Sequence, residues 1–289
     1  MPKLDKPILI ISHANCDDGM GAAWASWKKF GNTADYWFAF YGSEPPPVKD
    51  KEVYLVDFSY SREALIKMNE EARELKVLDH HETAENILKD LPFCHFDGSK
   101  SGAMLAWEYF HSGVPNGILL HHIQDNDLWK FECPRTKAFI MNLRSHPQTI
   151  ATFNSINDGL ENKKSGDEFY KAFVRDGETL LRYFNAQLSL AVKATAQDIT
   201  LCGIKGRVAN LTGMFASEAG NLMAGDYGTF GMTYFVHSTG SIKCSIRSQK
   251  GNGCNVADIA LTFGGGGHAN ASGFSLTQEQ LIGLLNANK

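Results

Sequence analysis

The sequence predicts an α/β protein of two lobes, an N-terminal domain with a parallel sheet and a smaller C-terminal α/β domain. In the first part of the chain, short apolar runs alternate with amphipathic segments, as in parallel sheets with helices on their faces. After residue 198 the texture changes to closely spaced strand-like runs with many glycines. A chain of 289 residues, 43% of them hydrophobic, can bury two cores. We therefore expect domains at residues 1–195 and 196–289.

The first part of the chain alternates between strand and helix patterns. Apolar runs predict strands at Ile8–Ser12, Tyr36–Tyr41, Glu52–Phe58 and Val77–Leu78. Helices are predicted at Gly21–Phe30, which Gly31 ends, and at Ser61–Leu75, which carries charged residues on one face and apolar residues on the other. These elements give the alternation on which the parallel sheet depends.

Helical patterns dominate the middle of the chain, and strands return in its last third. Helices are predicted at Gly102–Phe110, Asn116–Gln124 and over the proline-free segment Asp167–Ala196. The later strands are predicted at Ile199–Cys202, Val208–Leu211, Thr233–Val236 and Ile242–Ile246. A helix-like segment, Val256–Phe263, and a strand-like one, Ala271–Leu276, flank a run of glycines.

Composition excludes several classes of protein. With 28 Lys+Arg against 32 Asp+Glu, the formal net charge of −4 argues against a coat for long nucleic acid, whereas short phosphate substrates stay open. No apolar stretch approaches the roughly 18 residues of a membrane span, and the N-terminal apolar run is too short for a signal peptide. The six cysteines form no CxxC pair, so we expect no zinc knuckle and reduced thiols in the cytoplasm.

Acidic and histidine residues follow several predicted strands. They are His13 and Asp18 after the first strand, Asp57 at the end of the third, and Asp79-His80-His81 at the end of the fourth. A further group lies in the run from His121 to Trp129. An Asp at a strand end is often only a turn former or a helix cap. Because ligands of parallel sheets bind beyond the carboxyl ends of the strands, the combination favours one shared site.

The residue types in this group favour a divalent metal centre. Oxygen and imidazole ligands without a thiolate cluster suit Mn²⁺, Mg²⁺, Fe²⁺ or Co²⁺. Several carboxylates around one point would repel each other unless a cation lay between them. Two such ions, roughly 3.5–4 Å apart and sharing a carboxylate, can activate water and hold the oxygens of a phosphoryl group.

The glycine run Gly264–Gly267 is a candidate phosphate site. Without Cβ atoms, successive backbone N–H groups can approach an anion, and the next residue, His268, could donate to a phosphate. The alternative interpretation is a flexible turn. Arg247, which follows a predicted strand, is a second candidate phosphate ligand through its planar guanidinium. Aromatic residues such as Trp129 suggest an organic base that stacks on them.

Two motifs carry a family resemblance that covers nearly the whole chain. Asp79-His80-His81 with Asp57 upstream, and the glycine run with His268 and the segment up to Gly273, resemble the DHH phosphoesterase family with its C-terminal DHHA1-type substrate-binding domain. The resemblance implies two lobes with the active site in the cleft between them. It also implies hydrolysis of short oligonucleotides or small nucleotides by a metal-activated water. The alternatives are a polyphosphate or pyrophosphate hydrolase and a catalytically impaired nucleotide-binding module.

The resemblance also implies a role for each matching residue. The metal ligands would be His13 and Asp57 for the first ion, and Asp18, Asp57, His80 and Asp125 for the second. The catalytic residues would be His81, which contacts the scissile phosphate, Asp57, which bridges the ions, and Asp79, which orients a histidine. The substrate-binding residues would be Arg247, Gly264, Gly265, Gly266, Gly267, His268 and Ser272.

The sequence departs from the family pattern at one ligand position. Cys16 stands where the family has an aspartate for the first metal, and Asp17 is its neighbour and the alternative ligand. Asp125 is preferred to Asp127 because it ends the helix-like run. The implied cofactors are two divalent ions, Mn²⁺ before Mg²⁺, Co²⁺ or Fe²⁺. The expected partner is a short single-stranded oligonucleotide or a nucleotide phosphate, with no membrane and no long duplex, and a homodimer stays open.

Overall fold

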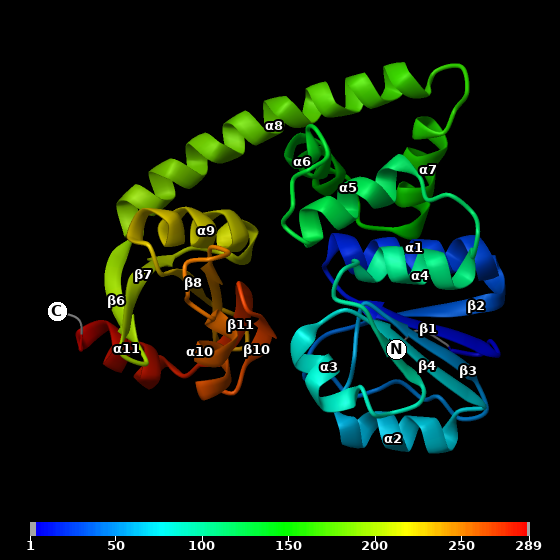
Figure 1. Ribbon diagram of the computed structural model, residues 1–289, viewed down its shortest axis with the longest axis horizontal. Helices are drawn as coiled ribbons and strands as arrows, with labels where there is room; N and C mark the ends of the chain where they lie inside the picture. Colours follow the sequence, from blue (N-terminus) through cyan, green and yellow to red (C-terminus); the bar gives the residue numbers. More distant parts are fainter. Residues whose placement is uncertain (1–3, 288–289) are drawn as a thin grey trace. The chain divides into compact units, whose positions relative to one another are not determined.

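The computed structural model describes residues 4–287 and consists of two compact units, residues 1–181 and 182–289 (Figure 1). The division between the units falls inside one long helix, α8 (Gly166–Thr195). The boundary that the sequence suggests, near residue 195, coincides with the end of this helix and stays a prediction.

The first unit is built on a five-stranded sheet in which every pair of neighbours is parallel. The strand order is β2-β1-β3-β4-β5. The strands are β1 (Ile8–His13), β2 (Ala34–Ala39), β3 (Glu52–Val56), β4 (Glu74–Asp79) and β5 (Cys94–Phe96). Because all strands run in one direction, their carboxyl ends meet at a single edge of the sheet. The predicted parallel sheet is confirmed.

Helices cover both faces of this sheet (Figure 1). The helices of this unit are α1 (Asp17–Phe30), α2 (Arg62–Glu71), α3 (Glu82–Leu88), α4 (Gly102–Phe110), α5 (Ile118–Asp127), α6 (Thr136–Ser145) and α7 (Ile150–Leu160), with a 3₁₀ turn at Gly31–Thr33. Of these, α5, α6 and α7 pack on other helices. The alternation of β1 divides its side chains between two cores. Ile10 packs on the side of α1 and α4, whereas Leu9 and Ile11 pack on the side of α2 and α3.

The structure corrects the predicted limits of three helices in the first unit, of which α5 spans Ile118–Asp127 and not Asn116–Gln124. Helix α1 begins at Asp17, before the predicted Gly21, because Gly19 lets the helix start lie against the end of β1. A Cβ on Gly19 would lie 2.2 Å from the carbonyl oxygen of His13. Helix α2 ends at Glu71, because Leu75 belongs to β4, where it pairs with Val53.

The second unit has a six-stranded mixed sheet with the order β10-β11-β9-β8-β7-β6. Its strands are β6 (Gln197–Leu201), β7 (Ile204–Asn210), β8 (Phe230–Val236), β9 (Ile242–Ser248), β10 (Gly266–His268) and β11 (Ala271–Leu276). Its helices are α9 (Ala216–Tyr227), α10 (Val256–Thr262) and α11 (Gln278–Asn286), with a 3₁₀ turn at Gly213–Phe215. Apolar residues of α10, α11 and the sheet share one core. The predicted second, smaller α/β domain is confirmed.

Over residues 4–287, we find no helix with the length and apolar character needed to cross a membrane.

Candidate metal centre

Asp57 lies at the middle of the sheet edge, directly after β3. Its backbone adopts a left-handed conformation with φ of 57°, which turns the carboxylate away from the strand direction. The side chain is buried, and its Oδ1 lies 3.1 Å from Nε2 of His80. A Cβ on Gly102 would lie 2.3 Å from the Cβ of Asp57, so only glycine lets the start of α4 come this close.

Asp18, in the first turn of α1, is held in place by the start of α4. Its two carboxylate oxygens accept the backbone N–H groups of Gly102, at 2.6 Å, and of Ala103, at 3.0 Å. A carboxylate at a helix N-terminus satisfies donors that the helix itself leaves unpaired. Oδ2 of Asp18, which accepts the N–H of Gly102, also lies 3.6 Å from Nε2 of His80. One side chain therefore joins α1, α4 and the residue after β4.

Three carboxylates converge on the ring of His80. Besides Asp57 and Asp18, Oδ2 of Asp127 lies 3.6 Å from the same Nε2 atom. Among the described residues, Oδ2 of Asp57 and Oδ2 of Asp127 are buried without a hydrogen-bond partner. Burial and the neighbouring carboxylate of Asp18 raise the pKa of Asp57 well above its usual value and that of Asp127 to about 7. Such crowded carboxylate oxygens fit a bound cation, which would keep them ionised.

His13 and Cys16 extend this cluster to the end of β1. The ligand atoms of His13, Cys16 and Asp57 lie within 4.8 Å of one another. Burial lowers the pKa of His13 to about 4, and burial together with Asp57 raises the pKa of the Cys16 thiol. Asp17 instead forms an ion pair with Arg144 at 2.6 Å. The structure therefore brings Cys16, and not Asp17, into a group with the two candidate ligands.

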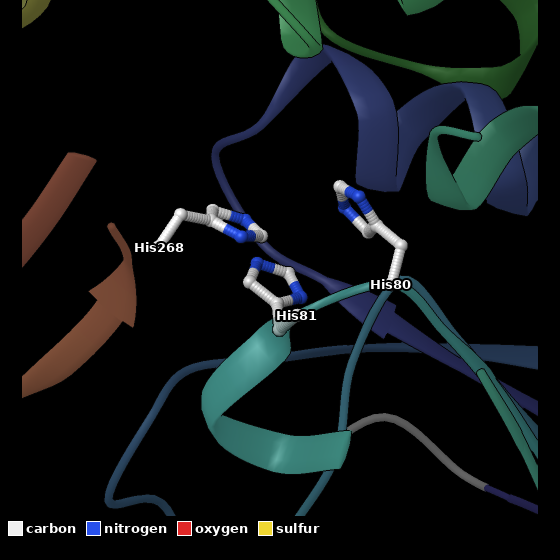
Figure 2. A group of neighbouring side chains, drawn as sticks. All are labelled: His80, His81 and His268. Carbon is white, nitrogen blue, oxygen red and sulfur yellow. The ribbon is translucent and has the colours of Figure 1, made fainter. Parts of the chain in front are cut away.

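Asp79 and His81 form a hydrogen-bonded pair beside the carboxylates. Figure 2 shows His80 and His81 where β4 passes into α3; His268, also drawn there, belongs to the second unit. Oδ1 of Asp79 lies 2.7 Å from Nδ1 of His81, and Oδ2 accepts the hydroxyl of Ser59 at 2.6 Å. Burial acts to lower the pKa of His81, but Asp79 outweighs it and raises that pKa to about 9.

Asp125, which the sequence favours over Asp127 as a ligand, lies outside the carboxylate cluster. Its carboxylate accepts the backbone N–H groups of Glu132, at 2.7 Å, and Cys133, at 3.1 Å, and the hydroxyl of Thr136. These three donors occupy both oxygens, so Asp125 holds the loop that follows α5. Asp127, at the last residue of α5, joins Asp18 and His80 in a group of candidate ligands.

In the second unit, the glycine run is part of the sheet. Gly266 and Gly267 belong to β10, and they pair with Gly273 and Ser272 of β11. A Cβ on Gly265 would lie 2.1 Å from the carbonyl oxygen of Gly273. Close backbone packing thus requires glycine at position 265. The prediction of a phosphate loop or a flexible turn did not include this packing role.

The other residues assigned to substrate binding lie around this strand pair. Ser272 is buried and donates its hydroxyl to the carbonyl oxygen of His268 at 2.9 Å. The guanidinium of Arg247 donates to the carbonyl of Ile246 and to the hydroxyl of Ser217, at 2.9 and 3.0 Å. Burial lowers the pKa of Arg247 to about 10. Among the described residues, no carboxylate lies within ion-pair distance of this guanidinium.

Sequence analysis missed three residues that shape the first unit's site. Ser59 and Gly102 support Asp79 and Asp57, and Tyr41 contacts the ring of His13. Gly102 had a signal, since a serine followed by glycine begins the predicted helix at that point. Neither Ser59 nor Tyr41 carries a local pattern, because each is brought to the site by the folding of the sheet.

Comparison with known proteins places this geometry in context. Residues 206–288 match the family model of the DHHA1 domain. The uncharacterized protein R106 of Acanthamoeba polyphaga mimivirus is 29% identical over 300 residues, which are 94% of this chain and 68% of that protein.

One solved structure shows the same fold at low sequence identity, and a second is similar along most of its length. The DHH domain of a member of the s1p family of ribosomal proteins aligns with 98% of this chain and 85% of its own, with a TM-score of 0.54 and 12% identity. The pGpG-specific phosphodiesterase PggH from Vibrio cholerae aligns with 98% of this chain and 100% of its own, with a TM-score of 0.46 and 15% identity. The chain thus shares the fold of this DHH-domain structure, and its residues 206–288 match the DHHA1 domain, in agreement with the predicted resemblance.

Proposed function

We propose that this protein is a divalent-metal-dependent phosphoesterase that hydrolyses phosphodiester or phosphomonoester bonds of short oligonucleotides or small nucleotides. One observation carries the proposal. Three carboxylates surround Nε2 of His80, and two of their buried oxygens have no hydrogen-bond partner among the described residues. Without a cation, the mutual repulsion and the unpaired oxygens cost free energy. A bound cation would remove this cost, so the arrangement favours cation binding.

The cluster offers ligands for two ions that share Asp57. His13, Cys16 and Asp57 would hold the first ion, and Asp57, Asp18, His80 and Asp127 the second. Mn²⁺ suits this mixture of oxygen and imidazole ligands, with Mg²⁺, Co²⁺ or Fe²⁺ as alternatives. When bound, such ions lower the pKa of a coordinated water and stabilise negative charge on the phosphoryl oxygens.

The chain's own residues would position the substrate beside these ions. His81 donates its Nδ1–H to the carboxylate of Asp79, which fixes the ring and leaves Nε2 to contact a phosphoryl oxygen. Ser59 holds Asp79 from the other side, and Asp79 also accepts the backbone N–H of His80 at 2.7 Å. Asp79 is thus a positioning residue for both histidines, because it orients one ring and fixes the backbone of the other.

The second unit would contribute to substrate binding through Arg247. Among the described residues, the partly buried guanidinium of Arg247 donates to neutral oxygens only, so it retains a strong attraction for an anion. Gly264, which precedes β10 with φ of 74° and open space around its Cα, can present its backbone to a phosphate. His268 and Ser272 lie on the adjoining strand pair.

A product-resolved assay tests this function. The protein is incubated with Mn²⁺ and, separately, with labelled di- to penta-ribonucleotides, adenosine 3′,5′-bisphosphate, a cyclic dinucleotide and polyphosphate. We expect metal-dependent hydrolysis of at least one nucleotide substrate, abolished by EDTA and restored by Mn²⁺. Hydrolysis of polyphosphate alone would support the alternative hydrolase. Nucleotide binding without turnover, at full metal content, would support the catalytically impaired module.

A further inference from the structure

Tyr41 is an exposed aromatic residue at the edge of the candidate metal centre. It lies two residues after the end of β2, and 58% of its surface is exposed. Its ring centroid lies 5.1 Å from that of His13 and 6.1 Å from that of His81. Tyr41 therefore contacts the ring of a candidate metal ligand and the ring of the residue proposed to contact the phosphate.

A tight turn fixes the backbone of Tyr41 in this place. The backbone N–H of Ser43 donates to the carbonyl oxygen of Phe40 at 3.0 Å, which makes Tyr41 and Gly42 the two central residues of a β-turn. Gly42 has φ of 82°, the value that a type II turn requires at its third position. The hydroxyl of Ser43 also donates to the carbonyl of Phe40, at 2.6 Å. The exposed ring is thus presented by a defined turn.

Aromatic side chains support the ring of Tyr41 from the protein side. The Phe58 ring lies 5.1 Å from that of Tyr41 and is fully buried, and it stacks on His13 at 6.0 Å. The exposed Trp129 differs, because Lys137 lies over its ring at 5.7 Å and Phe131 packs against it at 4.8 Å. Tyr41 has a rigid apolar support and an exposed surface, which are the features of a stacking platform.

We propose that Tyr41 is the stacking platform for the nucleobase next to the scissile phosphate. This inference rests on the proposed function and narrows its substrates to nucleotides that carry a base beside that phosphate. The occupant follows from position, since Tyr41 borders His13 and His81, so a base attached to a phosphate held by His81 lies within reach of its ring. Every base presents a flat π-face to such a ring, so the platform selects for a base without selecting its identity.

The test compares three substrates in four proteins. The substrates are a labelled diribonucleotide and the same molecule in which one base is replaced by an abasic site, made in two versions with either base removed. The proteins are wild type, Tyr41→Ala, Tyr41→Phe and Phe40→Ala. Phe40 is the matched control because it is the adjacent aromatic residue, is 52% exposed and, among the described residues, makes no ring contact with His13 or His81. Mn²⁺ content is measured for each protein.

We expect wild type to prefer the full diribonucleotide over one of the abasic versions by about tenfold in kcat/KM, as a stacked base predicts. Tyr41→Ala should lose this preference with Mn²⁺ content unchanged, while Tyr41→Phe and Phe40→Ala keep it. If Tyr41→Ala keeps the preference, or loses Mn²⁺ and slows equally on all substrates, the stacking role is refuted and the proposed function stands. If wild type with full metal content hydrolyses none of them and no other nucleotide, the proposed function fails and this inference fails with it.

Discussion

The carboxyl edge of the first sheet and the glycine segment of the second unit were both predicted from motifs, yet they differ in how the fold uses them. At the sheet edge, His13, Asp57 and His80 come from different strand ends and meet because the strands are parallel. In the glycine segment, Gly266 and Gly267 follow one another in sequence and pair with β11. Topology therefore assembles the first site, whereas local backbone packing explains much of the second motif.

The largest expected effect is at Asp57, which would bridge both ions. Asp57→Asn should lower turnover by at least about a hundredfold and reduce the Mn²⁺ content, because the shared charge is lost. The fold should persist, since Asn tolerates the left-handed backbone that Asp57 adopts. Turnover with Mn²⁺ and metal analysis of the purified protein provide the measurement.

Asp50→Asn is the matched control for this substitution. Asp50 has φ of 60°, close to the 57° of Asp57, but it is exposed and lies before β3. It should change neither turnover nor metal content. A protein with Asp57→Asn that kept near-normal turnover and metal content would contradict the two-ion centre at the sheet edge.

The next effect distinguishes packing from anion binding in the glycine segment. Gly265→Ala should lower the local opening free energy of β11 by about 2 kcal/mol or more, because the new Cβ would collide with the carbonyl of Gly273. Gly264→Ala, which meets no atom within 4 Å and only strains φ, should cost about 1 kcal/mol. Hydrogen exchange of the β11 amides measures both. If Gly265→Ala left exchange unchanged but weakened phosphate binding, the segment would serve mainly as an anion loop.

The two regions also show which parts of the structure local sequence can reveal. The strand Ala271–Leu276 and the helix Gly102–Phe110 have the predicted limits, because their apolar patterns are clear and capping or turn residues bound them. Helices α3, α7, α9 and α11 and strands β5 and β10 were missed. Strand β10 consists of glycines and a histidine, and it exists because β11 lies beside it. Local propensity cannot report such a partner.

The same limit explains the preference for Asp125 over Asp127. The two carboxylates are two residues apart, and the choice depends on where α5 ends and how the following loop folds back. Asp125 meets the backbone N–H groups of Glu132 and Cys133 only once that loop is formed. Trp129 and Phe131 in this loop have φ of 53°, a conformation that their residue types do not predict.

A pair of substitutions tests whether Asp127 binds the metal and Asp125 stabilises the loop after α5. Asp127→Asn should weaken Mn²⁺ binding about tenfold with little change in stability, because it removes a ligand charge from the cluster. Asp125→Asn should cost about 1–2 kcal/mol of stability, because charged hydrogen bonds to the loop become neutral or are lost. Mn²⁺ titration calorimetry and urea unfolding separate the two outcomes. Equal losses of Mn²⁺ affinity in both variants would show that Asp125 also acts on the metal centre.

The smallest expected effect concerns His122, which is buried behind Asp125. Its Nδ1 lies 2.8 Å from the hydroxyl of Thr136, and its Nε2 lies 3.2 Å from that of Tyr170. Burial lowers the pKa of His122 to about 4, although Asp125 opposes the shift. The unfolded chain, with an ordinary His pKa of about 6.5, therefore binds more protons than the folded one between these two values. The part of the folding stability that depends on neutral His122 is fully present above pH 6.5 and is lost as the pH falls toward 4.

Protonation of His122 in the unfolded chain should make the protein about 1 kcal/mol less stable at pH 5.5 than at pH 7. His122→Asn, which can still bond Thr136 but does not titrate, should remove that part of the slope when urea midpoints are compared at the two pH values. His121→Asn is the control, because it changes the adjacent exposed histidine. If the slope of His122→Asn equals that of wild type, the His122 ring is not what makes the first unit sensitive to acid. His13, whose pKa burial also lowers to about 4, then becomes the candidate for that dependence.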